Sequence, residues 1–418
     1  MGIVMQLFRF ITDAMGECFR GSKRYWTWIA LLVTLTCQGV FFYAHQLQTG
    51  LVVTGMSDQV SWGFYISNFA FFVGIAAAAV LLVIPAYIFD RKDVKQVVLL
   101  GEALEVAAVL VAMTFALVDI GHPERFWHAI PYIGIFNFPY SLLAWDIIVL
   151  GGYLLLNLAT AFYVLFKHYR DREPQSTLFF SFVVIAMFWA ISIHSVTAFI
   201  FSSNPGRTMW HTALLAPRFI ASAFASGPAL IIITLGLIRK ATRYEINQSV
   251  IDLLALIMTI AMQINLFFVG AELFTDFYNE GAHGASVRYL FLGLEGIGKL
   301  QPWIWSALLM NVVALIILMI HPLRRNPKTL IIACVLGFLG IWIEKGMGLI
   351  VPGFIPTTLG EVFEYFPTAL EFAVGIGIWS FGMLVFTLLA KIVIGVELGL
   401  LRFNKHTEAI SSGTEGPI

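Results

Sequence analysis

The stretch ISNFAFFVGIAAAAVLLVIPAYIF, residues 66–89, decides the fold class of this chain. It contains no charged side chain, and it is longer than the roughly 20 apolar residues that one bilayer crossing needs. Because the membrane core offers no water to backbone polar groups, such a segment must hydrogen-bond within itself, as an α-helix does. The stretch therefore predicts a transmembrane helix.

Nine further apolar stretches, bounded by charged residues, Gly or Pro, support the same prediction. They lie at residues 26–44, 97–120, 142–166, 178–201, 220–238, 250–275, 303–320, 330–351 and 370–393. Of the 418 residues, 59% are hydrophobic and 12% are charged, whereas soluble domains carry about 25% charged residues. We expect an all-α integral membrane protein with ten transmembrane helices in one membrane domain, residues 26–395.

Lysine and arginine alternate between the two sets of connecting segments. Nineteen of the 25 lie in the N-terminal tail, in every second connection and in the C-terminal stretch; the other connections hold five, and Lys345 lies within a helix. The positive-inside rule then places both termini in the cytoplasm. Residues 1–25 lack the compact apolar core of a secretory signal and predict a cytoplasmic, interfacial amphipathic segment. Residues 396–418 are expected to form a cytoplasmic tail.

Several classes of partner and cofactor are disfavoured. The net charge of zero gives no basic surface for nucleic acid, so we expect no nucleic-acid partner. Cys18, Cys37 and Cys334 are too far apart in sequence to indicate a disulfide framework or an iron–sulfur cluster. A transmembrane haem needs axial ligands from facing helices, and of nine His residues only His194 lies well inside a span. We expect no haem, iron–sulfur cluster or metal site in this chain.

Polar side chains gather in the outward third of the predicted helices. Ionisable groups are costly in a membrane and need a functional explanation. Such groups among Trp and Phe suit an amphipathic ring ligand whose oxygens need hydrogen-bond and proton partners. Mutual pairing that only fixes helix packing is the alternative. The residues of this layer are His45, Asn68, Asp119, Asp146, His194, Arg218, Glu272, Glu344, Lys345 and Glu371.

Several motifs resemble those of the NrfD/PsrC family, the quinone-interacting membrane subunits of polysulfide-reductase-like complexes. SWGFYISNFAFFVGIAAAA (61–79) is similar to the second-helix signature of the ten-helix members. The other similar motifs are DIGHPERFW (119–127), FPYSLLAWD (138–146), WIEKGMGLIVPGFIP (342–356) and YFPTALEF (365–372). Within the family, residues 53–68, 190–199 and 215–229 most resemble the DsrP branch, which is linked to sulfur and sulfite metabolism. Residues 76–79, all Ala, depart from the Gly that many members carry.

The resemblance implies two four-helix bundles plus two extra helices, in the inner membrane of a prokaryote. It also implies that the chain holds no cofactor of its own and exchanges electrons between menaquinol or menaquinone and an outward subunit with several iron–sulfur clusters, ferredoxin-like in kind. A multihaem cytochrome c and other membrane subunits are further expected partners, besides the lipid membrane. Membrane subunits of the Qrc, Hmc and alternative complex III assemblies share this pattern and remain alternatives.

We expect the quinone head group among the second to fifth helices, at the outward level. Asp119, Asp146 and His194 are the candidate acid–base residues, because carboxyl and imidazole groups can exchange protons with a quinone. The candidate binding residues are Asn68, His122, Arg125, Arg218 and His45. A structural ion pair between Asp146 and Arg218 is one alternative. A site near Glu272, Glu344 and Glu371 is the other.

Two rivals belong to other classes. A secondary transporter would place its site near the midplane beside interrupted helices, whereas here the polar layer is off-centre and Pro lies mostly at span ends. A passive anchor for redox partners is the third possibility.

Two further expectations concern protons and docking. Glu105 and Asp119 share a helix face but lie about 21 Å apart, so a proton relay would need Glu102, neighbouring helices or water between them; separate packing contacts are the alternative. The long outward connections, residues 121–139 and 276–302, are expected to dock the iron–sulfur subunit.

Overall fold

The computed structural model describes residues 3–174, 176–278, 281–294 and 296–403. In this part of the chain the regular structure is helical, apart from one isolated β-bridge between Leu294 and Ile297. Ten of its helices are long and apolar enough to cross a membrane, which confirms the prediction. They are α2 (Lys23–Thr49), the second span from α3 to η2 (Phe64–Ile88), α5 (Lys92–Asp119), α6 (Leu142–Tyr169), α7 (Ser176–Ser202), α8 (Leu215–Ala241), α9 (Gln248–Tyr278), α11 (Gln301–Met319), α13 (Pro327–Lys345) and α14 (Ala369–Glu397).

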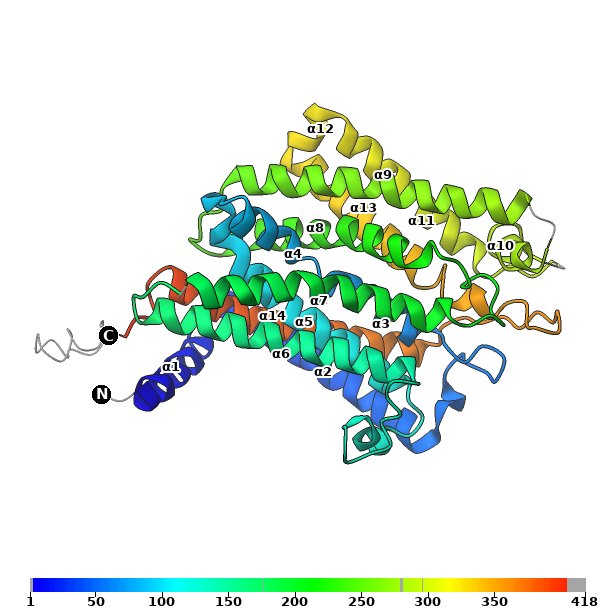
Figure 1. The fold of residues 1–418 in the computed structure, drawn as a ribbon, viewed down its shortest axis with the longest axis horizontal. Coiled ribbons are helices and arrows are strands. Elements are labelled where there is room, and N and C mark those ends of the chain that lie inside the picture. The colour runs from blue at the N-terminus through cyan, green and yellow to red at the C-terminus, as the bar shows by residue number, and fades with distance from the viewer. Residues whose placement is uncertain (1–2, 175, 279–280, 295, 404–418) are drawn as a thin grey trace, which may run out of the picture.

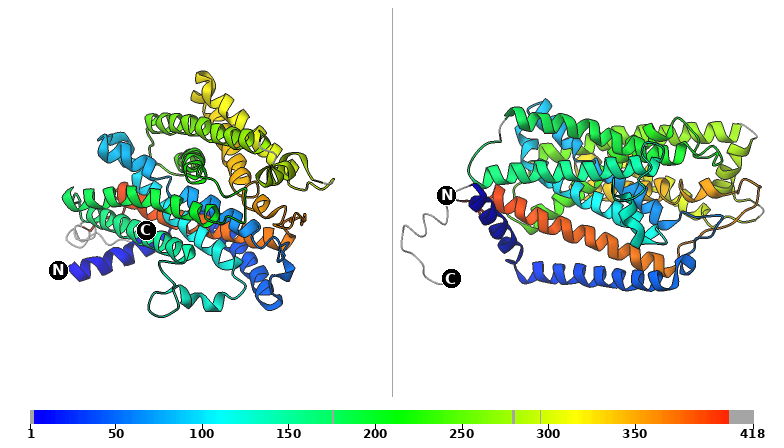
Figure 2. Two further views of the ribbon diagram at one scale, coloured as in Figure 1. Left: turned by 45° about the vertical axis from the view of Figure 1, so that its right-hand side comes forward. Right: turned by 60° about the horizontal axis from the view of Figure 1, so that its bottom comes forward.

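The long helices form two bundles and an outlying pair. Helices α3, α5, α6 and α7 contact one another in a ring, and α8, α9, α11 and α13 form a second ring. The bundles meet where α3 and α7 contact α8 and where α3 contacts α13. Helices α2 and α14 pack together beside α5 (Figure 1; Figure 2, right). The expected architecture of two four-helix bundles plus two helices is therefore confirmed.

Burial differs sharply between the spans. In the second span, 89% of the most apolar window is buried inside the protein, against 11% in α2. A helix that is apolar on all sides is found in a protein interior or in a membrane. The second span is a transmembrane helix that is also buried inside the protein. It is the central helix around which the first bundle, α8 and α13 pack.

This central span is not one continuous helix. α3 (Phe64–Ala76) ends at a turn of three alanines, 77–79; α4 (Val80–Val83) follows, and then the π-helical segment η2 (Ile84–Ile88). Pro85 lacks an N–H and crowds the preceding turn, which explains the widened π turn. The break lies in the four-alanine run, and the backbone N–H of Ala79 donates to the Glu105 carboxylate at 2.8 Å.

The ninth span is shorter than predicted. α13 ends at Lys345, whereas the apolar run predicted a helix to residue 351. Gly346 and Gly348 have low helix propensity and Pro352 lacks a donor, so the chain turns into η4 (Val351–Phe354). This buried turn packs on Trp210, whose indole N–H donates to the Leu349 carbonyl at 2.8 Å. Glu344 and Lys345 thereby lie at a helix end.

The N-terminal segment forms α1 (Ile3–Cys18), as expected for residues 1–25. Phe10 packs in a small cluster with Tyr169 at the end of α6, while Ile3 and Phe8 are exposed. α1 lies at the same end of the molecule as the end of α14 (Figure 1). The domain boundaries at residues 25 and 395 stay predictions. Most of the tail predicted at 396–418 lies outside the described residues.

Four short elements complete the connections. They are η1 (Leu51–Val53), η3 (Pro123–Ala129), α10 (Ala282–Leu292) and α12 (His321–Arg325).

Two glycines allow α2 and α14 to touch. A Cβ atom on Gly39 would lie 2.6 Å from the Cα of Gly377, and one on Gly377 would lie 2.5 Å from the Cα of Gly39. Both neighbouring atoms are backbone, so neither can move without separating the helices. Small residues at such crossings let transmembrane helices approach closely.

We predict that Gly377→Ala destabilises the protein, because the new methyl group forces α2 and α14 apart. Overpacking of this kind costs about 1–3 kcal/mol. Thermal unfolding of the purified protein in detergent would show a lowered midpoint. Gly151→Ala on α6 is the matched control, since a Cβ there meets nothing within 4 Å. Equal midpoints for the two variants would contradict the packing analysis.

Candidate functional site

Polar side chains gather at the end of the molecule where α5 finishes and α14 begins, which we call the outer end. It lies opposite α1 (Figure 1). The predicted polar layer is found here, divided into several groups on different helices. Their contacts decide which residues hold the fold together and which retain unused hydrogen-bonding capacity.

Glu371, in the first turn of α14, is a heavily bonded carboxylate of the outer end. It is fully buried and accepts hydrogen bonds from the backbone N–H groups of Gly55 and Thr368, each at 2.8 Å. Together with the Thr368 hydroxyl it forms a capping box for α14. The Tyr365 hydroxyl donates to Glu371 and accepts from the N–H of Phe64 at 2.7 Å. This carboxylate therefore ties α14 to the start of the second span.

The Tyr365 phenol is held in its neutral form. Burial, and then the adjacent Glu371 carboxylate, raise the pKa of Tyr365 well above its ordinary value. The hydroxyl therefore stays a hydrogen-bond donor at any physiological pH. Glu371 and Tyr365 together behave as a structural clamp.

Next to this clamp lie two buried polar atoms without a partner in the described part of the chain. They are Oδ1 of Asp119, the last residue of α5, and the hydroxyl of Tyr43 on α2. Gln46 separates them from the core: its amide donates to the Val118 carbonyl at 2.9 Å and accepts from the Tyr65 hydroxyl at 2.7 Å. Most buried polar atoms in proteins are paired, so unpaired ones need an explanation. These two mark a place where a polar ligand or water would be stabilised.

Asn68 contacts other helices than predicted. Its amide oxygen accepts from the indole N–H groups of Trp342 and Trp379, each at 3.0 Å, and its amide nitrogen donates to Phe64 at 2.8 Å. The side chain thus faces α13 and α14. Three of its four hydrogen-bonding directions are used in packing, which leaves one N–H.

Asp146 on α6 and His194 on α7 are both buried. Asp146 accepts from the Thr197 hydroxyl at 2.6 Å, and Thr197 lies one helical turn from His194 on the same face of α7. His194 is 1% exposed, and its Nδ1 lies 2.9 Å from the Ala190 carbonyl. The backbone of Gly74 on α3 also lies near the His194 ring.

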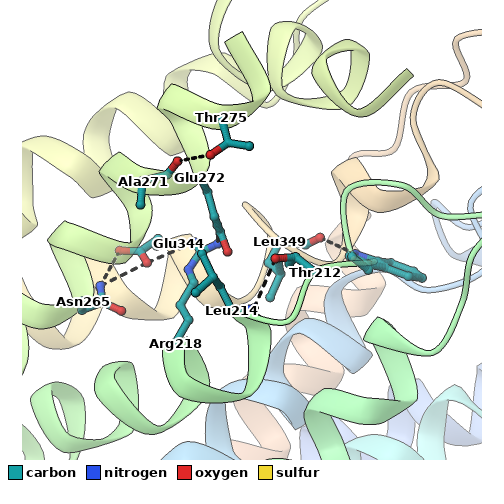
Figure 3. A network of polar contacts seen from close by, with 10 residues as sticks. Thr212, Leu214, Arg218, Asn265, Ala271, Glu272, Thr275, Glu344 and Leu349 are labelled. Atoms are coloured by element: carbon teal, nitrogen blue, oxygen red, sulfur yellow. Dashed lines mark hydrogen bonds and ion pairs between the residues drawn. The ribbon is translucent and has the colours of Figure 1, made fainter. Parts of the chain in front are cut away.

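Arg218 contacts two glutamates (Figure 3). It pairs with Glu272 on α9 and, at 3.2 Å, with Glu344 on α13. The alternative ion pair with Asp146 is therefore wrong, because that carboxylate bonds to Thr197. Glu344 also accepts from the amides of Asn265 at 3.1 Å and Asn311 at 2.7 Å. Buried charges are tolerated when they are paired and hydrogen-bonded in this way.

The adjacent Lys345 faces the junction of the two bundles. Its ammonium lies 4.1 Å from the ring centre of Phe219 and 3.5 Å from the Phe219 carbonyl. A Cβ on Gly74 of the second span would lie 2.9 Å from this ammonium. With Arg218, Glu272 and Glu344 it completes a set of two positive and two negative groups, which suits burial in an apolar environment.

The cavity beside Arg218 and Glu272 is small. Its volume is about 90 Å³, and Thr212 and Leu273 also line it. Ligand pockets usually measure about 300–1,000 Å³. This space suits a few water molecules.

The remaining predicted residues are exposed. His45 lies on the surface of α2, and His122 and Arg125 lie beside and within η3, beyond the end of α5. His122 Nδ1 is 2.8 Å from a carboxylate oxygen of Glu124. Hydrogen bonds from the Glu124 backbone and from this ring lower the pKa of Glu124. No hydrogen bond or ion pair among the described residues joins His122 or Arg125 to Asp146 or His194.

Sequence reasoning found the ionisable residues of the outer end but missed the hydroxyl and amide groups around them. Tyr43, Gln46, Tyr65 and Tyr365 resemble ordinary interfacial residues in sequence. The one readable signal was Thr-x-x-Glu at 368–371, a capping-box pattern. Among the described residues no group of three or more His, Cys, Asp or Glu is placed to hold a metal ion. The absence of haem and iron–sulfur clusters stays a prediction.

Comparison with known proteins gives related membrane subunits. The chain is 28% identical to a putative dimethyl sulfoxide reductase membrane subunit of Halobacterium salinarum, over 90% of this chain and 92% of that protein. It is 27% identical to the Hdr-like menaquinol oxidoreductase integral membrane subunit of Archaeoglobus fulgidus, over 93% and 96%. It is 22% identical to the menaquinone reductase integral membrane subunit of Nitratidesulfovibrio vulgaris, over 89% and 92%. The model of the polysulphide reductase NrfD family matches residues 52–355, which is most of the chain, and the protein therefore belongs to this family.

Proposed function

We propose that this chain is the quinone-reactive membrane subunit of a redox complex. It would exchange electrons between menaquinol or menaquinone and an external iron–sulfur subunit. Two relatives are named as subunits of a menaquinol oxidoreductase and a menaquinone reductase, which supports a quinone as the substrate here. The chain would work only within a complex, since electrons must leave the quinone site through another subunit.

The pair of unpartnered atoms at Asp119 and Tyr43 carries this proposal. A quinone gains two protons with two electrons, so its oxygens need a hydrogen-bond donor and a group that exchanges protons. The Tyr43 hydroxyl supplies the donor. The Asp119 carboxyl supplies the proton exchange, and the polar residues near it, Glu371 and Tyr65, are already fixed by other bonds. We place the head group beside Asp119 and Tyr43.

The other predicted residues take secondary places in this proposal. Asp146 on α6 and His194 on α7 would contribute further hydrogen bonds. Asn68 would hold the tryptophans that border the site, and His122 and Arg125 would cover it from outside. His45 lies at its rim. Arg218 is the weakest member, because its bonds are directed into the second bundle.

We further propose the partners and the cellular setting. The outer connections would dock a ferredoxin-like iron–sulfur subunit, with a multihaem cytochrome c and other membrane subunits in the same assembly. The termini would be cytoplasmic and the membrane the inner membrane of a prokaryote. The DsrP-like motifs favour a complex of sulfur or sulfite metabolism over a Qrc, Hmc or alternative complex III assembly.

The interrupted second span is a feature that transporters also have. Pro at a span end therefore does not exclude an interrupted helix, while the off-centre polar layer still disfavours a transporter. The assay below separates the classes, because neither a transporter nor a passive anchor would transfer electrons from a quinol.

We predict that Asp119→Asn lowers quinol turnover by the purified complex about 100-fold or more, the usual effect of losing a general acid–base group. Turnover is measured as quinol-dependent reduction of the iron–sulfur partner, or as the reverse reaction. Asp252→Asn is the matched control, a carboxyl-to-amide change on α9 at the opposite end of the membrane domain. Normal turnover and KM in both Asp119→Asn and Tyr43→Phe would place the site elsewhere.

The docking surface gives a second prediction. The connection at 121–139 exposes Trp127, Tyr132 and Ile135, and a soluble partner would cover them. Chemical crosslinking of the intact complex, read by mass spectrometry, should join this connection and residues 276–302 to the iron–sulfur subunit. If the iron–sulfur partner were crosslinked only to residues 90–95 and 239–247, the assignment would be reversed.

A further inference from the structure

The break in the second span faces a pair of buried acids that the proposed quinone site does not use. Glu102 and Glu105 on α5 are 5% and 2% exposed, and they lie on one face of the helix, three residues apart. Glu105 accepts from the N–H of Ala79 at 2.8 Å and from the Tyr153 hydroxyl at 3.1 Å. These bonds join the broken span, α5 and α6.

Within the described part of the chain, no cation pairs with these acids. The ion pairs formed by the described residues do not include Glu102 or Glu105. The titratable groups that face them are phenols, Tyr153 from α6 and Tyr87 from η2. Two adjacent carboxylates in an apolar interior cannot both stay ionised without a countercharge. At least one proton must therefore be bound to the pair.

One hydrogen-bonding position of the pair is unused. Oε2 of Glu102 is buried without a partner among the described residues. Asn157 is 4% exposed, lies one turn further along α6 from Tyr153, and interacts with the Tyr153 side chain. An unused carboxyl oxygen next to a second carboxyl group suits a bound proton.

α5 begins at the end of the molecule that carries α1, with Glu102 ten residues beyond Lys92 and Glu105 at the middle of the helix. An open surface hollow of about 630 Å³ lies at that end, lined by Gln96, Tyr244 and Glu397 among others. Gln96 precedes Glu102 by six residues, about 9 Å along α5. Tyr87 is within electrostatic range of both Glu102 and Glu397. A polar surface at this end of the molecule is therefore the nearest source of protons for the two glutamates.

We propose that Glu102 and Glu105 form an internal proton-binding site that clamps the broken second span and exchanges its proton with solvent at the α1 end. Glu105, as the acceptor of two hydrogen bonds, carries the negative charge, and Glu102 holds the proton. A proton that moves from Glu102 to Glu105 weakens the bond to Ala79, so the site links proton occupancy to the shape of the central span. This site is separate from Asp119, which lies 14 residues further along α5 than Glu105, about 21 Å away.

Infrared spectroscopy of the purified complex tests this proposal without any quinone reaction. The wild-type protein should show a protonated-carboxyl band that shifts in D₂O within minutes. The Glu102→Gln/Glu105→Gln double variant should lack it. Asp252→Asn on α9 should retain it. Gln preserves the size of Glu and one acceptor oxygen. If the double variant fails to assemble, each single Gln variant can be measured instead. Each should change the position or the intensity of the band.

Either of two results would overturn the proposal. One is identical carboxyl spectra in the wild type and the variants, which would mean that the pair holds no proton. The other is a band that does not shift in D₂O, which would exclude exchange with solvent. Because the readout involves no electron transfer, these outcomes are independent of whether Asp119 serves a quinone.

Discussion

The cost of an unpaired polar group in the membrane interior governs this structure. Each such group loses its water and must find a partner inside the protein. Glu371 gathers hydrogen bonds from a loop, a helix start and a tyrosine, and Glu344 gathers an arginine and two asparagines. Glu371 ties α14 to the start of the second span, and Glu344 ties α13 to α8, α9 and α11 within the second bundle. Buried carboxylates cost free energy, and they accept hydrogen bonds only from donors placed at the right distance.

The same constraint gives meaning to the exceptions. Asp119 and Tyr43 leave polar atoms unpaired beside a network that is otherwise complete. Glu102 does so in the other half of the membrane domain. An unpaired polar atom next to a hydrogen-bonded network indicates a binding position for an exchangeable group, such as a substrate, a water molecule or a proton. In the second bundle the charged groups of Arg218, Glu272 and Glu344 pair with one another, although Oε1 of Glu272 and Oδ1 of Asn265 and Asn311 have no partner among the described residues.

The number and order of the spans could be predicted because lipid demands long apolar runs, and Lys and Arg mark their ends. The break at residues 77–79 could not, because Ala is the best helix former and the cause lies in Pro85 and in Glu105 on another helix. The pairing of Arg218 was equally hidden, since Glu272 and Glu344 lie 54 and 126 residues away. The ionisable residues of the site could be recognised in the sequence because charged groups are energetically costly to place in a membrane. The partners that leave Asp119 free, such as Gln46 and Tyr65, had no such signal.

Photoaffinity labelling of the intact complex with a photoreactive menaquinone analogue tests the central claim, that the substrate binds beside Asp119, most directly. The account predicts labelled peptides at the outer ends of α2, α3 and α5, around Tyr43, Tyr65 and Asp119, and protection by excess menaquinone. Labels confined to α8, α9 and α13 around Arg218, or labels that menaquinone does not displace, would contradict it.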